Sequence, residues 1–407
     1  MNPPLTPRSR MACYGALLLS LLCAGCASVP EGPSNEDWKK AQARAAGERV
    51  PDSLRPYYTV LYAEGERNRT LNWMRLATAA MQEGQWTVAR QALDEAIIYI
   101  DSLQAGNEQA EQAKDNFKSE SFKPFKGEPY ERVMVYLYRG LIFYQEGQYD
   151  NAIACCKSGA LQDLPGPVKK EGDPVAEPDY QTLYFLECLS WQRLGKMSRA
   201  AEAWVRLRKF APSLPETMPE IGSQTLVVAN VGIGPYKVAV GQYRELLAFR
   251  EPNQSYHFMR MPAGWTGVGD NLSFQAMTRG GRTMDEINRG KAAVKGATDA
   301  AGDILLMGGG VAGVEGLNRG DDTVAIAGGA AFLAGLISKA VSSATTPQAD
   351  IRSWDTLPSA VFLGFGPVPD AGGTVTLRFL NKSHGAEVNT VLNLQTQPQG
   401  GVIWAWK

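Results

Sequence analysis

The chain contains two histidines, His257 and His384, among its 407 residues. His257 lies in the segment Ser-Tyr-His-Phe, which we expect at a sheet edge, and His384 lies in Asn-Lys-Ser-His-Gly, which is typical of a hairpin turn. A histidine relay or metal cage needs imidazoles gathered in one place. The chain also lacks the Gly-x-Ser-x-Gly elbow, the His-Glu-x-x-His motif and the Gly-x-x-x-x-Gly-Lys phosphate loop. We therefore expect no catalysis, no metal, no cofactor and no small-molecule ligand.

Acidic pairs are the remaining candidates for acid–base chemistry. Asp285-Glu286 and Asp321-Asp322 are more typical of charges at a helix start than of a catalytic dyad. An enzyme of unknown chemistry stays an alternative, and it would require Arg352, Asp355 and His257 to meet in one pocket.

Residues 283–345 hold much of the chain's glycine excess, and the segment Gly308-x-Gly310-x-x-Gly313 matches the dinucleotide-binding fingerprint. The preceding apolar run is short and no acidic residue follows about 20 positions later, so the match does not predict a nucleotide site. We predict a buried helical hairpin whose glycines allow close packing. The alternative is self-association or membrane contact through small faces such as Gly309 and Gly313, which would give the protein a structural or pore-associated role.

A cysteine near the N-terminus offers another chemistry, acylation of its thiol. Residues 1–25 carry Arg8 and Arg10 ahead of the apolar run 11–22 and end directly before Cys26. That run is shorter than the ~20 residues of a membrane-spanning helix and is typical of a secretory signal. The sequence Cys23-Ala24-Gly25-Cys26 resembles the lipobox of bacterial lipoproteins, with Cys23 where an aliphatic residue is usual. The alternative is an ordinary cleaved signal with an incidental cysteine.

The lipobox resemblance implies an envelope location. Cleavage before Cys26 and acylation with palmitate or similar chains would hold the protein on a membrane by its lipid. Ala27, rather than aspartate, follows the cysteine, which by resemblance to enterobacterial sorting rules favours the outer membrane, facing the periplasm. Residues 26–50 then form a tether and a leading helix.

Three further cysteines remain in the mature chain, Cys155, Cys156 and Cys188. The adjacent pair lies in a helical pattern, where a free cysteine behaves as a small apolar residue. A disulfide from either of them to Cys188 is the alternative in an oxidising periplasm.

Composition limits the classes of partner. Lys+Arg total 41 and Asp+Glu total 42, for a formal net charge of −1. Without a basic excess we expect no nucleic acid. Hydrophobic residues make up 44% of the chain, enough for one or two packed domains.

Residues 51–213 have helical apolar spacing and contain three similar segments. When the segments are aligned on Gly84, Gly147 and Gly195, an aromatic residue or methionine follows two positions later and alanine five positions later. The segments resemble tetratricopeptide repeats, with glycine ending helix A and small residues allowing helices A and B to approach. The residues that define the pattern are Trp73, Ala77, Gly84, Ala89, Ala96, Gly140, Gly147, Tyr149, Ala152, Cys188, Gly195 and Ala200.

Such an array predicts a concave groove that binds protein partners, so we expect an interaction scaffold that supports an envelope assembly. The alternative is a solenoid that packs on the C-terminal domain. The spacing between the aligned glycines is longer than in tandem repeats, which indicates insertions within 107–129 and 164–178.

Residues 220–407 read as a β-rich domain that carries the glycine-rich helical insert 283–345. Alternating or apolar runs predict strands at 224–231, 236–240, 243–249, 357–365, 373–380, 388–394 and 401–406. The predicted fold class is therefore α+β, a tetratricopeptide-like α-solenoid followed by a mixed β domain.

Two short motifs in this domain carry a further resemblance. Residues 230–237, Asn-Val-Gly-Ile-Gly-Pro-Tyr-Lys, and 350–358, Asp-Ile-Arg-Ser-Trp-Asp-Thr-Leu-Pro, are similar to motifs of a family of uncharacterised bacterial lipoproteins with N-terminal repeats. The resemblance implies an envelope protein with a protein partner. From the residues themselves we expect Trp354 to bury its ring, Arg352 to pair with a neighbouring aspartate, and Pro358 to start a strand, with ligand recognition as the alternative.

Overall fold

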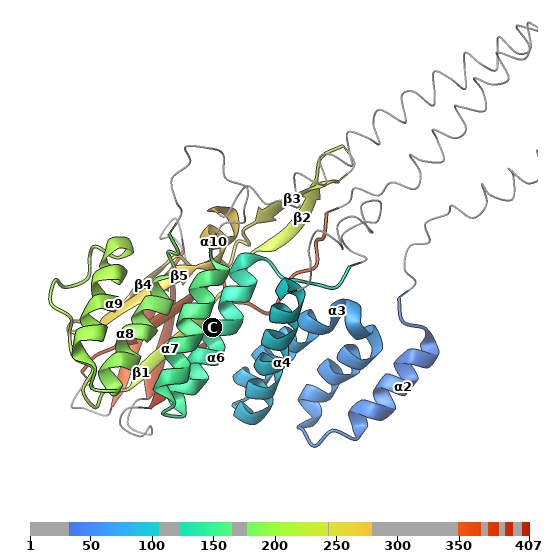
Figure 1. The fold of residues 1–407 in the computed structure, drawn as a ribbon, viewed down its shortest axis with the longest axis horizontal. Coiled ribbons are helices and arrows are strands. Elements are labelled where there is room, and N and C mark those ends of the chain that lie inside the picture. The colour runs from blue at the N-terminus through green and yellow to red at the C-terminus, as the bar shows by residue number, and fades with distance from the viewer. Residues whose placement is uncertain are drawn as a thin grey trace, which may run out of the picture.

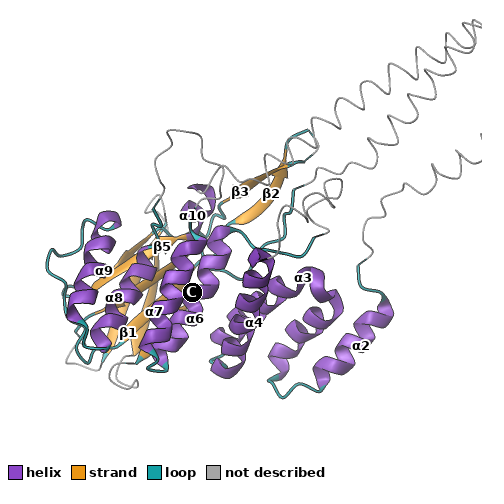
Figure 2. Cartoon of the chain, viewed as in Figure 1, coloured by secondary structure: helices purple, strands orange, loops and turns teal. Residues whose placement is uncertain are grey.

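The computed structural model describes residues 32–105, 123–164, 177–242, 244–278, 349–367, 373–381, 387–393 and 401–407. Cys26, the glycine-rich insert 283–345, the two acidic pairs and His384 lie outside these residues. The fold is mixed α and β, as the sequence predicts, and its helices precede its strands along the chain (Figures 1 and 2). Within the described residues, none of the helices is both long and apolar enough to cross a membrane.

The helices form one layer of antiparallel hairpins. The leading helix α2 (Asn35–Ala46) and the 3-10 turn η2 (Asp52–Leu54) precede α3 (Arg55–Gln82) and α4 (Trp86–Ala105). The next hairpin is α6 (Pro129–Gln145) with α7 (Tyr149–Gln162), and the last is α8 (Gln181–Arg193) with α9 (Met197–Phe210). Helix α3 is kinked at Gly65, whose φ of 60° interrupts the helical backbone.

The three glycines on which the segments align end α3, α6 and α8 in the same way. Gly84, Gly147 and Gly195 have φ angles of 68°, 75° and 69°, a left-handed conformation that glycine adopts without a Cβ clash. The next residue in each case donates its N–H to the carbonyl five positions earlier, at 2.8, 2.8 and 2.9 Å, as in a Schellman turn. The alanines five positions after the glycines are completely buried. The repeated spacing therefore corresponds to one repeated backbone turn.

The strands form three sheets. A four-stranded sheet has the order β5 (Thr266–Asn271), β6 (Ala360–Phe365), β1 (Leu226–Val231) and β9 (Val402–Trp406), and only the β1–β9 pair is parallel among its described pairs. The strands β2 (Tyr236–Val240) and β3 (Leu246–Arg250) form a separate hairpin. The third sheet has the order β4 (Phe258–Arg260), β7 (Thr374–Leu380) and β8 (Glu387–Asn393). The short helix α10 (Leu272–Thr278) follows β5 directly.

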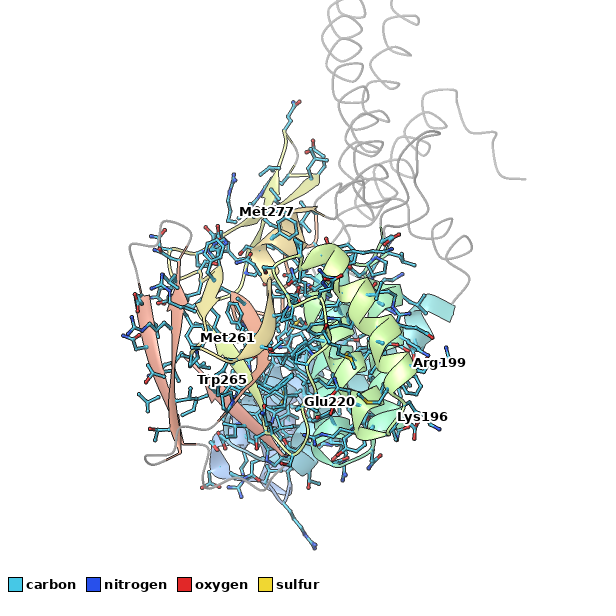
Figure 3. The ribbon with its side chains drawn as sticks, turned by 90° about the vertical axis from the view of Figure 1, so that its left-hand side faces the viewer. Lys196, Arg199, Glu220, Met261, Trp265 and Met277 are labelled. Atoms are coloured by element: carbon cyan, nitrogen blue, oxygen red, sulfur yellow. The ribbon has the colours of Figure 1, made fainter. Side chains whose placement is uncertain are left out.

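The four-stranded sheet is the middle layer of the molecule. One set of its side chains, including Val228 and Leu363, joins the core formed by the helices. The alternate set, including Val227 and Phe362, packs with Leu377 of the third sheet. This explains why β1 and β6 are buried at every position. Figure 3 shows the helices on one side, where Lys196 and Arg199 lie, and the strands near Met261 and Trp265 on the other.

The predicted strands correspond to β1, β2, β3, β6, β7, β8 and β9, with β3 starting at Leu246 rather than at residue 243. The prediction missed β4, β5 and α10. Strand β5 has the sequence Thr-Gly-Val-Gly-Asp-Asn, and glycine, aspartate and asparagine are depleted in strands. Tertiary packing overrides that preference, because a Cβ on Gly269 would collide with the ring of Phe362 on the neighbouring strand.

Candidate functional site

The most charged part of the interior is an ion pair between helix α6 and strand β2. Lys237 Nζ lies 2.7 Å from Glu131 Oε2, and the two side chains are 2% and 0% exposed. Lys237 also donates to the carbonyl oxygen of Arg352 at 2.8 Å. Glu131 accepts from the backbone N–H of Trp354 at 2.7 Å and from that of Glu128 at 2.7 Å. The buried carboxylate thus has a charged partner and two backbone donors, which compensate for its desolvation.

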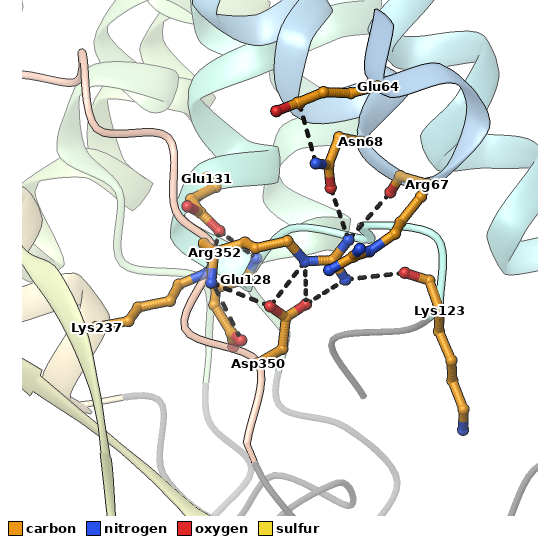
Figure 4. A network of polar contacts seen from close by, with 9 residues as sticks. All are labelled: Glu64, Arg67, Asn68, Lys123, Glu128, Glu131, Lys237, Asp350 and Arg352. Atoms are coloured by element: carbon orange, nitrogen blue, oxygen red, sulfur yellow. Dashed lines mark hydrogen bonds and ion pairs between the residues drawn. The ribbon is translucent and has the colours of Figure 1, made fainter. Parts of the chain in front are cut away.

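Arg352 extends this network to helix α3 (Figure 4). Its guanidinium forms an ion pair with Asp350 at 2.6 Å. It also donates to Asn68 Oδ1 at 2.8 Å and to the carbonyl oxygens of Arg67 and Lys123 at 3.1 and 2.9 Å. Arg67 and Asn68 lie just after the kink at Gly65, and the carbonyl oxygen of Arg67 also accepts from the backbone N–H of Phe125 at 2.9 Å.

The ring of Trp354 fills the space between the motif and α6. Trp354 is 1% exposed, and its ring meets that of Tyr138 edge-on with centroids 6.1 Å apart. Tyr138 donates its hydroxyl to Asn230 Oδ1 of β1 at 2.8 Å. The two motifs at 230–237 and 350–358 therefore meet at helix α6. The burial of Trp354 and the pairing of Arg352 with a neighbouring aspartate agree with the expectation from the sequence.

Pro358 lies two residues before β6 rather than at its first residue. The two motifs cross closely here, where Gly234 donates its N–H to the carbonyl of Leu357 at 2.9 Å. A Cβ on Gly234 would lie 2.8 Å from that oxygen and 2.9 Å from the carbonyl oxygen of Pro358. Glycine is therefore needed for the close approach of the two motifs.

The residues required by the enzyme alternative have separate partners. Arg352 pairs with Asp350, Asp355 pairs with Arg75 at 2.7 Å, and His257 contacts Glu251. Among the described residues, histidine, cysteine, aspartate and glutamate form no group that could hold a metal ion. The charged junction around Glu131 holds helix α6 against strand β2 and the motif at 350–358.

The three described cysteines carry free thiols, so the alternative disulfide to Cys188 is not formed. Burial raises the pKa of Cys155 and of Cys188 to about 12, and it raises that of Cys156 well above its ordinary value. Thiols with raised pKa values react slowly because little thiolate forms. Cys155 instead fits against Gly140, where an added Cβ would lie 3.2 Å from the Cβ of Cys155.

The inner face of the helical hairpins is covered by the chain's own strands. Phe185 of α8 stacks on Phe365 of β6 with centroids 5.9 Å apart. Tyr138 of α6 contacts the rings of Trp404 and Trp406 of β9. The groove that the sequence predicts for a partner is therefore occupied over these two hairpins, because helices and sheet bury their apolar faces in one shared core. The arrangement corresponds to the alternative, in which the solenoid packs on the C-terminal domain.

A second group of polar contacts joins the four-stranded sheet to α8. Asp270, the fifth residue of β5, accepts from the backbone N–H groups of Gln181 and Thr182 at 3.0 and 2.9 Å and from the hydroxyl of Thr182 at 2.5 Å. A carboxylate at a helix N-terminus satisfies backbone donors that have no partner within the helix. Burial nevertheless raises the pKa of Asp270 to about 7, because the carboxyl lies away from water.

Comparisons of the chain with protein-family models, curated proteins and solved structures find no match. Three residues of the site, Glu131, Tyr138 and Asp270, were not predicted from the sequence. Glu128 and Glu131 flank the start of α6 with the spacing of a capping box, so the pattern could have located Glu131 at a helix start. Its burial could not be predicted, because its partner Lys237 is 106 positions away.

Proposed function

We propose that the protein is an envelope lipoprotein, anchored through acylated Cys26 in the outer membrane and facing the periplasm, that acts as a protein-interaction scaffold rather than as an enzyme. The lipobox-like sequence before Cys26 supports the anchor. The three hairpins with identical glycine turns support a tetratricopeptide-like organisation of the helical layer.

The observation that carries the scaffold proposal is the set of three hairpins with the same glycine turn. The chain's own strands close the inner face of these hairpins, so we infer that a partner binds their outer faces. The apolar surface of the inner face is used for intramolecular packing, which makes helices and sheet one block with the outer faces of the helices turned to solvent. Apolar side chains remain on these faces, with Ile98 of α4, Leu161 of α7 and Val205 of α9 exposed by 59%, 67% and 64%. These three positions are candidate contact points for a partner on the outer faces.

Metabolic labelling with a palmitate analogue in a Gram-negative host tests the anchor. We expect label on the wild-type protein and none on Cys26→Ser, with the wild type in outer-membrane fractions. Ala27→Asp is the matched variant for sorting, and we expect it to move the protein to the inner membrane without loss of label. Equal labelling of wild type and Cys26→Ser would overturn the lipoprotein proposal.

A further inference from the structure

An open hollow of about 440 Å³ lies where α4, α6 and α7 meet. The hollow lies on the helical layer, apart from the buried junction around Glu131. Its lining includes Asp101, Arg132, Tyr136, Ser158, Leu161 and Leu164.

The polar side chains at the base of the hollow are held in place by bonds to one another. Arg132 donates to Gln162 Oε1 and to the carbonyl oxygen of Gly127, both at 2.7 Å. Tyr136 donates its hydroxyl to Asp101 Oδ1 at 2.6 Å. The base of the hollow is therefore formed before any ligand arrives, which reduces the entropy lost on binding.

Two carboxylates, those of Asp94 and Asp101, lie at the surface of this region. The guanidinium of Arg139, which neutralises Asp94, lies beneath them. Asp94, Ile98 and Asp101 lie at positions i, i+4 and i+7 of α4 and share one face of that helix. Asp94 pairs with Arg139 of α6 at 2.6 Å, but its side chain is 46% exposed whereas that of Arg139 is 5% exposed. Asp101 is also exposed. Asp94 and Asp101 therefore present carboxylate oxygens to solvent on this face of α4, and Arg132 of α6 adds one positive charge to the lining of the hollow.

Apolar side chains lie next to these carboxylates. Ile98 on α4 is 59% exposed, and Leu161 and Leu164 at the end of α7 are 67% and 39% exposed. Leu161 and, to a smaller extent, Leu164 keep apolar surface that their own fold leaves uncovered, so covering it with another apolar group is favourable at ~25 cal/mol per Å². The surface thus combines acidic and apolar recognition.

We propose that this hollow, defined by α4, α6 and α7, binds a short amphipathic helical segment of a partner protein, whose apolar side chains cover Leu161 and Leu164 and whose lysine or arginine pairs with Asp101. The inference rests on the proposed scaffold function and names the chemistry of its partner. A helix with apolar and basic residues one turn apart presents both groups on one face.

Fluorescence anisotropy with synthetic peptides and the purified protein tests this proposal. The probe is a labelled helical peptide with leucines one turn apart and lysines beside them. One control peptide has glutamate in place of lysine, and another has serine in place of leucine. We expect the leucine–lysine peptide to bind, and each control peptide to bind at least about tenfold more weakly.

Variants of the protein locate the binding. Asp101→Asn keeps the acceptor for Tyr136 and removes the charge, and Leu161→Ser removes an exposed apolar group at little cost to the fold. We expect each to weaken binding of the leucine–lysine peptide about tenfold, while Val205→Ser on α9, a similarly exposed site, leaves it unchanged. Absence of binding, equal binding of a control peptide, or unchanged binding by both Asp101→Asn and Leu161→Ser would overturn the proposal. None of these outcomes bears on labelling of Cys26, so the two proposals fail separately.

Discussion

Replacement of Lys237 by methionine removes the positive partner of Glu131. The shape of the side chain at position 237 stays largely unchanged. The structure gives the magnitude, because Glu131 is completely buried and pairs with Lys237 at 2.7 Å. Removing one member of a buried pair costs ~3–5 kcal/mol, since the other charge stays in the interior without compensation. A typical domain has a total stability of ~5–15 kcal/mol. Lys237→Met should therefore lose a large share of the free energy of unfolding.

Urea denaturation followed by tryptophan fluorescence measures this loss, because Trp354 lies within the same junction. The double variant Lys237→Met with Glu131→Gln is the matched control. It removes both charges, so we expect it to be more stable than Lys237→Met alone. If Lys237→Met lies within about 1 kcal/mol of the wild type, or if the double variant is less stable than Lys237→Met, the reasoning about the buried pair is refuted.

Three further predictions concern the turns, the carboxyl at α8 and the thiols. Gly195→Ala should lower the free energy of unfolding by about 1 kcal/mol, because the φ of 69° is unfavourable for alanine while the space is open; a cost near zero in urea denaturation would contradict this. The pKa of Asp270 is raised from 3.8 to about 7, so the folded protein holds this proton more tightly than the unfolded chain, and the contribution of this carboxyl to stability should be fully present below about pH 4 and be lost as the pH rises through about 7. Asp270→Asn should flatten that decrease in denaturation curves measured across this range, and an unchanged slope would refute the assignment. Burial of Cys155, Cys156 and Cys188 should make all three unreactive toward a thiol reagent at pH 8 until denaturant is added, and fast labelling of the native protein would contradict their raised pKa values.

Short sequence patterns predicted the features of the fold that depend only on neighbouring residues, namely the glycine turns and the alternating strand β7. Gly84, Gly147 and Gly195 require positive φ wherever the rest of the chain lies, and the alternation of residues 374–380 places one face of β7 inward without reference to its neighbours. Strand β5 could not be found in this way, because its glycines oppose strand formation and are explained only by residues of β6, Phe362 for Gly269 and Leu363 for Gly267.

The candidate site depends on residues far apart in the chain, and this limits its prediction. The motif at 350–358 indicated that Trp354 and Arg352 have structural roles, and both are buried or paired as expected. Their pairing with partners on α3 and α6 could not be predicted, since Arg352 reaches Asn68 across 284 positions. The sequence likewise left open whether the inner face of the hairpins binds a partner or packs on the sheet. Only the tertiary contacts decide between these alternatives.

Native-state hydrogen exchange tests most directly whether helices and strands form one cooperative block. Amides in the buried parts of α6, α8, β1 and β6 belong to elements that share one core, so we predict that they exchange with the same free energy, equal to that of global unfolding. Exchange of β1 and β6 at markedly lower free energy, while α6 and α8 stay protected, would show that the sheet leaves the inner face of the helices and would contradict this account.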